Sequence, residues 1–126
     1  MSTPAAYCYP IELVSVYDGD TVTANVDVGF GWRKTKLKCR LFGIDTPEIR
    51  GSSKEEKVLA YAAKAFLKEL LEGADEVILN SVAKPDKYGR CLAVLWADGV
   101  DVSELMIKEG HARPYDGGTK SSWVTK

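Results

Sequence analysis

Three short polar segments of this sequence carry residue types that act in catalysis and in metal or phosphate binding. They are Asp18-Gly19-Asp20-Thr21, the run from Arg40 to Glu48, and the run from Asp86 to Arg90. Each lies at the end of an expected strand or in the adjoining loop, where a rigid scaffold usually carries its functional residues. Any one of them has an ordinary explanation, as a turn or a solvated charge, so the inference rests on their combination.

The carboxylates of Asp20, Asp45 and Glu48 suggest a hard metal ion. If three such groups lie close together they repel one another and need a cation, and all-oxygen ligation selects Ca²⁺ or Mg²⁺. The planar guanidinium groups of Arg40 and Arg90 match phosphate oxygens. A hard cation, two arginines and a spare carboxylate that activates water are suited to hydrolysing a phosphodiester.

Several other polar residues have simpler interpretations. Turn formation alone explains Asp18 with Gly19, because an aspartate side chain bonds local backbone amides. His111 is the single histidine and has no nucleophile or metal partner evident in the sequence, so we interpret it as structural. Tyr88 and Tyr115 offer flat faces on which a base or a sugar packs.

The composition is that of an ordinary globular chain. With 126 residues, 45% of them apolar, we expect one domain over 1–126, with a core from about 11 to 116 and flexible tails. A net charge of −1 does not indicate nucleic-acid binding, which must then come from local charge. Three widely spaced cysteines favour free thiols over a disulfide framework or a zinc site.

No targeting signal is evident in the chain. No apolar run approaches the ~18–20 residues of a membrane span, so no membrane association is expected. The N-terminus lacks the basic start and apolar core of a signal peptide, which favours the cytoplasm, with secretion left open if the chain has been trimmed.

The elements that would position the polar segments are short strands. Alternation and turn residues predict five of them, over 12–17, 21–28, 34–44, 75–82 and 90–97, with a wide hairpin loop over 29–35. Asp20 shares the inward parity of Val22 and Ala24. The third strand has an outer basic stripe, interpreted as a solvated face rather than a nucleic-acid track; it consists of Lys34, Lys36, Lys38 and Arg40.

Two helices complete the pattern. Ser53 with Glu56 fits a capping box at the start of a long helix that Gly73 ends. Asp101 with Glu104 caps a short second helix. The apolar face of the long helix is expected to consist of Val58, Ala62, Ala65, Phe66 and Leu70.

The order of the elements predicts an α+β, mainly β fold. It is a five-stranded Greek-key barrel of the oligonucleotide-binding (OB) type, with a helix between strands 3 and 4 and a C-terminal helix. Other α+β arrangements fit the same pattern.

The segments DGDT, RLFGIDTPE and DKYGR, in this order, resemble the staphylococcal nuclease (thermonuclease) family, and WADG and LMIKEGHA extend the similarity over about 12–115. The resemblance implies an OB-fold barrel and Ca²⁺-dependent hydrolysis of DNA and RNA that leaves 3′-phosphate ends. It implies that Asp20 and Asp45 bind Ca²⁺ through their carboxylates, and Thr46 through its backbone carbonyl.

The same resemblance assigns the chemistry. It implies that Glu48 is the general base and that Arg40 and Arg90 bind the phosphate and the transition state. The segment GFGWRKT differs from the short connection of the family, which would place Phe30 or Trp32 near the substrate. Three further residues match positions that line the nucleotide pocket: Lys87, Tyr88 and Tyr115.

A second hypothesis is a non-catalytic OB-fold module that binds nucleic acid or a protein partner. Binding modules of this fold typically lack some of the demanding residues, and their joint presence here favours the enzyme. The expected partner is DNA and/or RNA, bound by a monomer. The sequence ranks neither DNA against RNA nor endonuclease against exonuclease action. The residues that favour the enzyme are Asp20, Arg40, Asp45, Glu48 and Arg90.

Overall fold

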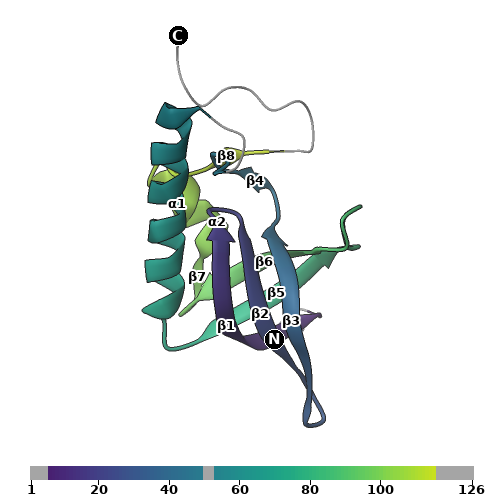
Figure 1. The fold of residues 1–126 in the computed structure, drawn as a ribbon. Coiled ribbons are helices and arrows are strands. Elements are labelled where there is room, and N and C mark those ends of the chain that lie inside the picture. The colour runs from purple at the N-terminus through teal and green to yellow at the C-terminus, as the bar shows by residue number, and fades with distance from the viewer. Residues whose placement is uncertain (1–5, 50–52, 116–126) are drawn as a thin grey trace.

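The computed structural model describes residues 6–49 and 53–115, which form a barrel flanked by helices (Figure 1). Five long strands run in the order β3-β2-β1-β5-β6, and parallel pairing of β6 with β3 closes the barrel. This confirms the five-stranded, OB-type α+β fold. The strands are β1 (Cys8–Asp18), β2 (Thr21–Gly29), β3 (Trp32–Leu41), β5 (Val77–Ala83) and β6 (Cys91–Ala97).

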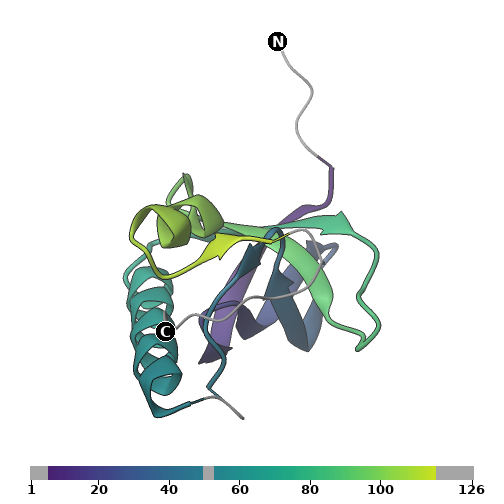
Figure 2. The same cartoon turned by 90° about the horizontal axis from the view of Figure 1, so that it is seen from above.

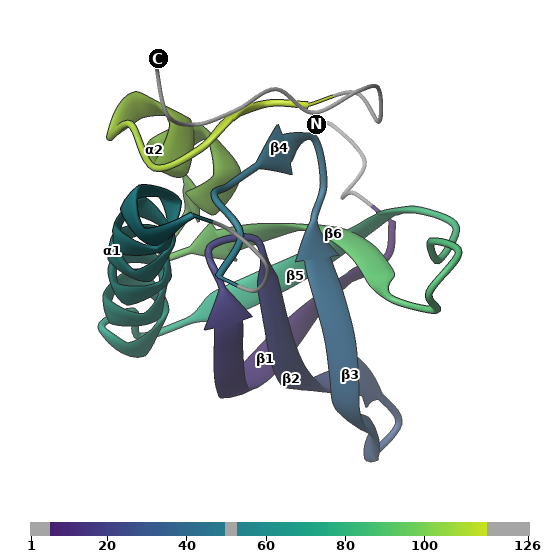
Figure 3. The ribbon, with the colours of Figure 1, turned by 45° about the horizontal axis from the view of Figure 1, so that its top comes forward.

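Three two-residue strands were not predicted. β7 (Val100–Asp101) extends the sheet at β6, whereas β4 (Ile44–Asp45) pairs with β8 (Arg113–Pro114) as a separate ribbon. The third predicted strand therefore divides, because the chain turns at Gly43 with a φ of 83° between β3 and β4. The β4–β8 ribbon lies across one end of the barrel (Figure 3).

The helices α1 (Lys54–Glu72) and α2 (Val102–Lys108) occupy the predicted places. The capping predictions are confirmed: the Glu56 N–H donates to Ser53 Oγ at 3.1 Å, and Asp101 accepts in the same way from the Glu104 N–H. Helix α1 stands along the side of the barrel next to β1, and α2 contacts it (Figures 1 and 2).

The predicted apolar face of α1 is wrong for three of its five residues. Val58 is 67% exposed, and Ala62 and Ala65 are exposed as well. The segment VLAYAAKAFLKELL is apolar around most of the helix, so periodicity admits neighbouring stripes and only packing against the barrel selects one. The buried stripe is Ala60, Ala63, Leu67 and Leu71, with Phe66 and Leu70 partly buried.

The β2–β3 connection is tighter than predicted. Gly29 and Trp32 pair with each other, so a two-residue turn of Phe30 and Gly31 replaces the expected wide loop. Both turn residues have positive φ, 59° and 77°, as a type I′ hairpin requires. The tip of this hairpin points away from the end that carries β4 (Figures 1 and 3). Phe30 and Trp32 therefore lie far from the candidate site, contrary to the prediction.

The barrel interior follows the predicted alternation. Val22, Ala24, Cys39 and Leu41 are fully buried, and Leu79 and Leu95 meet them from β5 and β6. In the described part of the chain, neither helix combines the length and apolarity needed to cross a bilayer. The expected flexible tail after Tyr115 lies outside the described residues, as do residues 1–5.

Candidate active site

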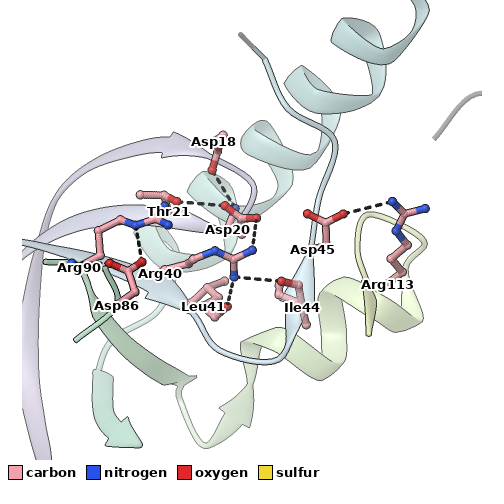
Figure 4. A network of polar contacts seen from close by, with 10 residues as sticks. All are labelled: Asp18, Asp20, Thr21, Arg40, Leu41, Ile44, Asp45, Asp86, Arg90 and Arg113. Carbon is pink, nitrogen blue, oxygen red and sulfur yellow. Dashed lines mark hydrogen bonds and ion pairs between the residues drawn. The ribbon is translucent and has the colours of Figure 1, made fainter. Parts of the chain in front are cut away.

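The three polar segments meet at the end of the barrel that carries β4 (Figures 3 and 4). The β1–β2 turn ends where Thr21 pairs with Arg40 of β3, and the Leu41 N–H donates to the Asp20 carbonyl at 2.8 Å. Closure of the barrel pairs Cys39 with Cys91, which brings Arg90 to the same edge as Arg40. Strand register, rather than sequence spacing, thus assembles the site.

A pocket of about 300 Å³ lies between these segments. Its lining includes five of the predicted site residues, Asp20, Arg40, Glu48, Tyr88 and Arg90, whereas Asp45, Thr46, Lys87 and Tyr115 are not part of it. Its lining is Tyr17, Asp18, Asp20, Arg40, Glu48, Ile49, Tyr88 and Arg90.

Arg40 leaves the basic stripe and turns into the site. Its Nη1 donates to the carbonyl oxygens of Leu41 and Ile44 at 3.0 and 3.1 Å, and its Nη2 lies 3.5 Å from Asp20 Oδ2 (Figure 4). The hydroxyl of Thr21 donates to the other Asp20 oxygen at 3.0 Å. These contacts hold a partly buried arginine and a buried carboxylate in one geometry, whereas the three lysines of the stripe stay exposed.

Arg90 is held by its own loop. Its Nε donates to Asp86 Oδ2 at 2.8 Å, while Asp86 Oδ1 accepts the backbone N–H groups of Tyr88 and Arg90. Burial tends to raise the pKa of Asp86, but the hydrogen bonds from the backbone and from the Arg90 guanidinium outweigh it and lower this pKa. Because the ion pair uses Nε, both Nη nitrogens of Arg90 remain available to a phosphate.

The three predicted nucleotide-pocket residues differ in which arginine they lie near. Two cations lie near the Tyr88 ring, with Arg90 Cζ 5.4 Å and Lys87 Nζ 5.2 Å from its centroid. Tyr115 instead contacts the other arginine, with Arg40 Cζ 5.7 Å from its ring centroid. Tyr88 therefore lines the pocket, whereas Lys87 and Tyr115 contact residues of the lining without being part of it.

Arg113 is a site residue that the sequence did not reveal. Asp45 and Arg113 are paired residues of β4 and β8, and Arg113 Nη2 lies 3.2 Å from Asp45 Oδ2 (Figure 4). Asp45 is only 1% exposed, so this cation compensates a buried charge. The two residues lie 68 positions apart, and no spacing rule connects them.

Oxygen donors suited to a hard cation are present, but not as three gathered carboxylates. No group of three His, Cys, Asp or Glu side chains within residues 6–49 and 53–115 is arranged to hold a metal ion. Asp20 and Asp45 are buried on adjoining segments, whereas Glu48 is exposed. The two aspartates and the Thr46 carbonyl would supply oxygen ligands only, which is the ligand chemistry that Ca²⁺ takes.

Negative charge is in excess where Asp18 lies buried beside Asp20. Its Oδ1 accepts the Asp20 N–H at 3.1 Å, as predicted for the turn. Burial, and next the negative charge of Asp20, raise the pKa of Asp18 to about 7. A cation bound beside these acids would relieve that cost, so the residues present fit a divalent ion.

Gly19 is required by a close approach and not by a left-handed turn. It is not among the residues with positive φ. A Cβ atom on Gly19 would lie 2.8 Å from Ala63 Cβ of α1 and 3.0 Å from Thr46 Cβ. The glycine thus lets α1 and the Asp45–Thr46 segment pack directly against the turn that carries Asp20.

We therefore expect Gly19→Ala to lower the free energy of unfolding by about 1–3 kcal/mol, because overpacking forces the backbone to shift. Urea denaturation would measure it. Adding Ala63→Gly removes the shortest contact and should recover part of the loss, whereas Ala62→Gly on the exposed face of α1 should add its own helix cost of ~1 kcal/mol and recover nothing. If the two double variants had the same free energy of unfolding, the packing explanation would be refuted.

His111, interpreted above as structural, packs its ring on Phe66 at a centroid distance of 4.7 Å. It does not line the pocket.

The fold and site define a five-stranded OB-type barrel with two arginines in a pocket at its strand ends. The model of the staphylococcal nuclease homologue family matches residues 38–122, so the chain belongs to this family. The match includes every predicted site residue except Asp20, which precedes it.

Similar proteins come from distant organisms. The chain is 33% identical over 101 residues to an uncharacterised protein of Bacillus anthracis, covering 79% of this chain and 44% of that protein. It is 32% identical over 117 residues to endonuclease Htp3 of Saprolegnia parasitica (82% and 54%). It is 28% identical over 102 residues to a thermonuclease of Staphylococcus hyicus (81% and 57%). The chain thus spans about half the length of the curated relatives it matches.

Proposed function

We propose that this chain is a Ca²⁺-dependent nuclease that hydrolyses phosphodiester bonds of DNA and/or RNA, acts as a monomer and leaves 3′-phosphate ends. The observation that supports it best is one pocket, in a chain of this family, that holds Asp20, Arg40, Glu48 and Arg90 together. Two relatives whose names describe them as an endonuclease and a thermonuclease point in the same direction.

In this proposal the two arginines bind the scissile phosphate. Arg90 offers its two Nη nitrogens, because Asp86 occupies only its Nε. Arg40 is fixed by two backbone carbonyls, so its charge is in place before the substrate arrives. Preorganised donors of this kind stabilise the charge that develops on the phosphorus oxygens. Tyr88, exposed at the pocket wall, provides a face for a base or sugar.

Glu48 acts as the general base. It lies exposed on the pocket wall, where water reaches it. Its carboxylate accepts a proton from the attacking water as the new P–O bond forms, while the bond to the 5′ oxygen breaks and the phosphate stays on the 3′ side. Ca²⁺ held by Asp20, Asp45 and the Thr46 carbonyl would add positive charge beside the phosphate when bound.

The test is digestion of single-stranded DNA, duplex DNA and RNA between pH 7 and 10, with Ca²⁺ or with chelator. We expect cleavage that requires Ca²⁺, products that accept a label only after their 3′ phosphate is removed, and strong loss of cleavage in Glu48→Gln. Tight binding of nucleic acid without cleavage at any pH would instead support the non-catalytic binding module.

A further inference from the structure

Two cysteines face each other across the seam where the barrel closes. Cys39 of β3 and Cys91 of β6 are paired residues of the parallel β3–β6 ladder. Cys39 is fully buried, and Cys91 shares the parity of the buried residues Ala93 and Leu95, so both thiols point into the barrel. Neighbouring strands lie about 4.8 Å apart, which is within the Cα separation that a disulfide spans.

The two cysteines differ in pKa and in exposure. The Cys39 thiol donates to the Leu37 carbonyl at 3.6 Å. Its proximity lowers the pKa of Cys91 to about 7 against the effect of burial, and the Ser81 side chain adds to this, while the same pairing raises the pKa of Cys39. Cys91 is partly exposed, whereas Cys39 is not. The pairing thus sets a partly exposed cysteine beside a buried one, the arrangement that a peroxide-sensitive thiol and its resolving thiol require.

The position of the pair links it to the candidate active site. Cys39 directly precedes Arg40, and Cys91 directly follows Arg90. Any change in the spacing of β3 and β6 at this pair therefore moves both arginines of the pocket.

We propose that Cys39 and Cys91 form a redox-active dithiol that a peroxide oxidises to a disulfide across the barrel seam, and that this bond reduces activity by displacing Arg40 and Arg90. The Cys91 thiolate attacks one oxygen of hydrogen peroxide, the O–O bond breaks, and a sulfenic acid and hydroxide form; the hydroxide takes up the proton that Cys91 had released and becomes the first water. The Cys39 sulfur then attacks the Cys91 sulfur, the S–O bond breaks, and the leaving hydroxide takes the Cys39 thiol proton to form the second water. Two thiols are oxidised by two electrons, and one peroxide is reduced to two waters; a dithiol reductant reverses the bond by exchange.

Peptide mapping by mass spectrometry tests the disulfide itself. After treatment of the reduced protein with hydrogen peroxide and alkylation in denaturant, a Cys39–Cys91 cross-linked peptide should appear, two hydrogens lighter, and dithiothreitol should remove it. The Cys8→Ser control lacks the exposed third cysteine and should form the same cross-link. Oxidation confined to Cys8, or overoxidation of Cys91 without a cross-link, would overturn the proposal.

Thermal melting gives a second readout that needs no variant. The bond closes a loop of about 50 residues, so the oxidised protein should melt on the order of 10 °C higher than the reduced protein. In protein that mass spectrometry shows to be cross-linked, an unchanged or lower melting temperature would overturn the proposed fit of the bond to the barrel seam.

The effect on activity rests on the proposed nuclease function and is measured separately. A displacement of about 1 Å in a catalytic group costs up to ~100-fold in rate, so we expect peroxide to lower cleavage by at least ~10-fold and dithiothreitol to restore it. In Cys91→Ala the ratio of treated to untreated activity should stay near 1. A cross-linked protein with unchanged activity would overturn the link to the arginines, whereas a protein inactive even when reduced would overturn only the nuclease proposal.

Discussion

Arg90→Ala is expected to lower kcat/KM for nucleic-acid cleavage by about 100-fold or more, with little loss of stability. Removing one preorganised donor to a developing oxyanion costs on the order of 3 kcal/mol in transition-state energy. The fold should tolerate the change, because Asp86 keeps its two backbone N–H partners and the lost ion pair is partly exposed. Steady-state kinetics and a thermal melt of the same preparation would check both parts.

Arg40→Ala should lower kcat/KM by a similar factor, but unlike Arg90→Ala it should also destabilise the fold. It removes the donor to the Leu41 and Ile44 carbonyls and leaves the buried Asp20 carboxylate without its cation. Leaving one member of a buried pair uncompensated costs about 3 kcal/mol, so this variant should also melt at a lower temperature.

The control for both variants is Arg33→Ala, which removes an exposed arginine of the β2–β3 hairpin, away from the pocket. It should leave kcat/KM within about threefold of the wild type, apart from a small change in salt dependence. If Arg90→Ala also stayed within about threefold, the arginine would not contact the transition state.

The second large effect concerns the two aspartates beside Gly19. Asp20→Asn should abolish Ca²⁺-dependent cleavage, because it removes one of two buried carboxylates proposed to hold the ion. Asp18→Asn should retain cleavage and, in chelator at pH 8, stabilise the protein by on the order of 3 kcal/mol. The asparagine oxygen still accepts the Asp20 N–H, and the buried charge is gone.

The raised pKa of Asp18 also predicts how the free energy of unfolding changes with pH. The pKa of Asp18 is about 7 in the folded protein and 3.8 without perturbation, so the folded state binds the extra proton. In chelator the wild type should therefore lose stability as pH rises from about 4 to 7, and Asp18→Asn should lose less. Urea denaturation at pH 5 and pH 8 would measure the free energy of unfolding of the wild type and of Asp18→Asn. Added Ca²⁺ should reduce the difference between the two proteins.

This outcome reverses the expectation from sequence alone, by which Asp18 serves the turn and its replacement by asparagine mainly lowers stability. Turn chemistry is visible in the residue types, and the hydrogen bond it implies is present. The burial of both acids at one pocket is not visible, because α1 and the Asp45–Thr46 segment come from distant parts of the chain. A destabilised Asp18→Asn in chelator at pH 8 would restore the simpler interpretation.

Local patterns determined much of this protein. Strand alternation predicted the inward Val22 and the buried Cys39, and side-chain caps predicted the starts of both helices, because these signals act within a few residues. The three polar segments could be identified from residue type alone, and so could the family resemblance that the match over 38–122 confirms.

Tertiary structure alone decided which of those residues meet. The buried stripe of α1, the pairing of Asp45 with Arg113 and the meeting of Cys39 with Cys91 all depend on contacts between distant segments. Sequence periodicity specifies which side of an element is apolar, but strand register and barrel closure specify its neighbours. That is why the acids and arginines could be found in the sequence, while their ion pairs, and the separation of the exposed Glu48 from the buried Asp20 and Asp45, could not.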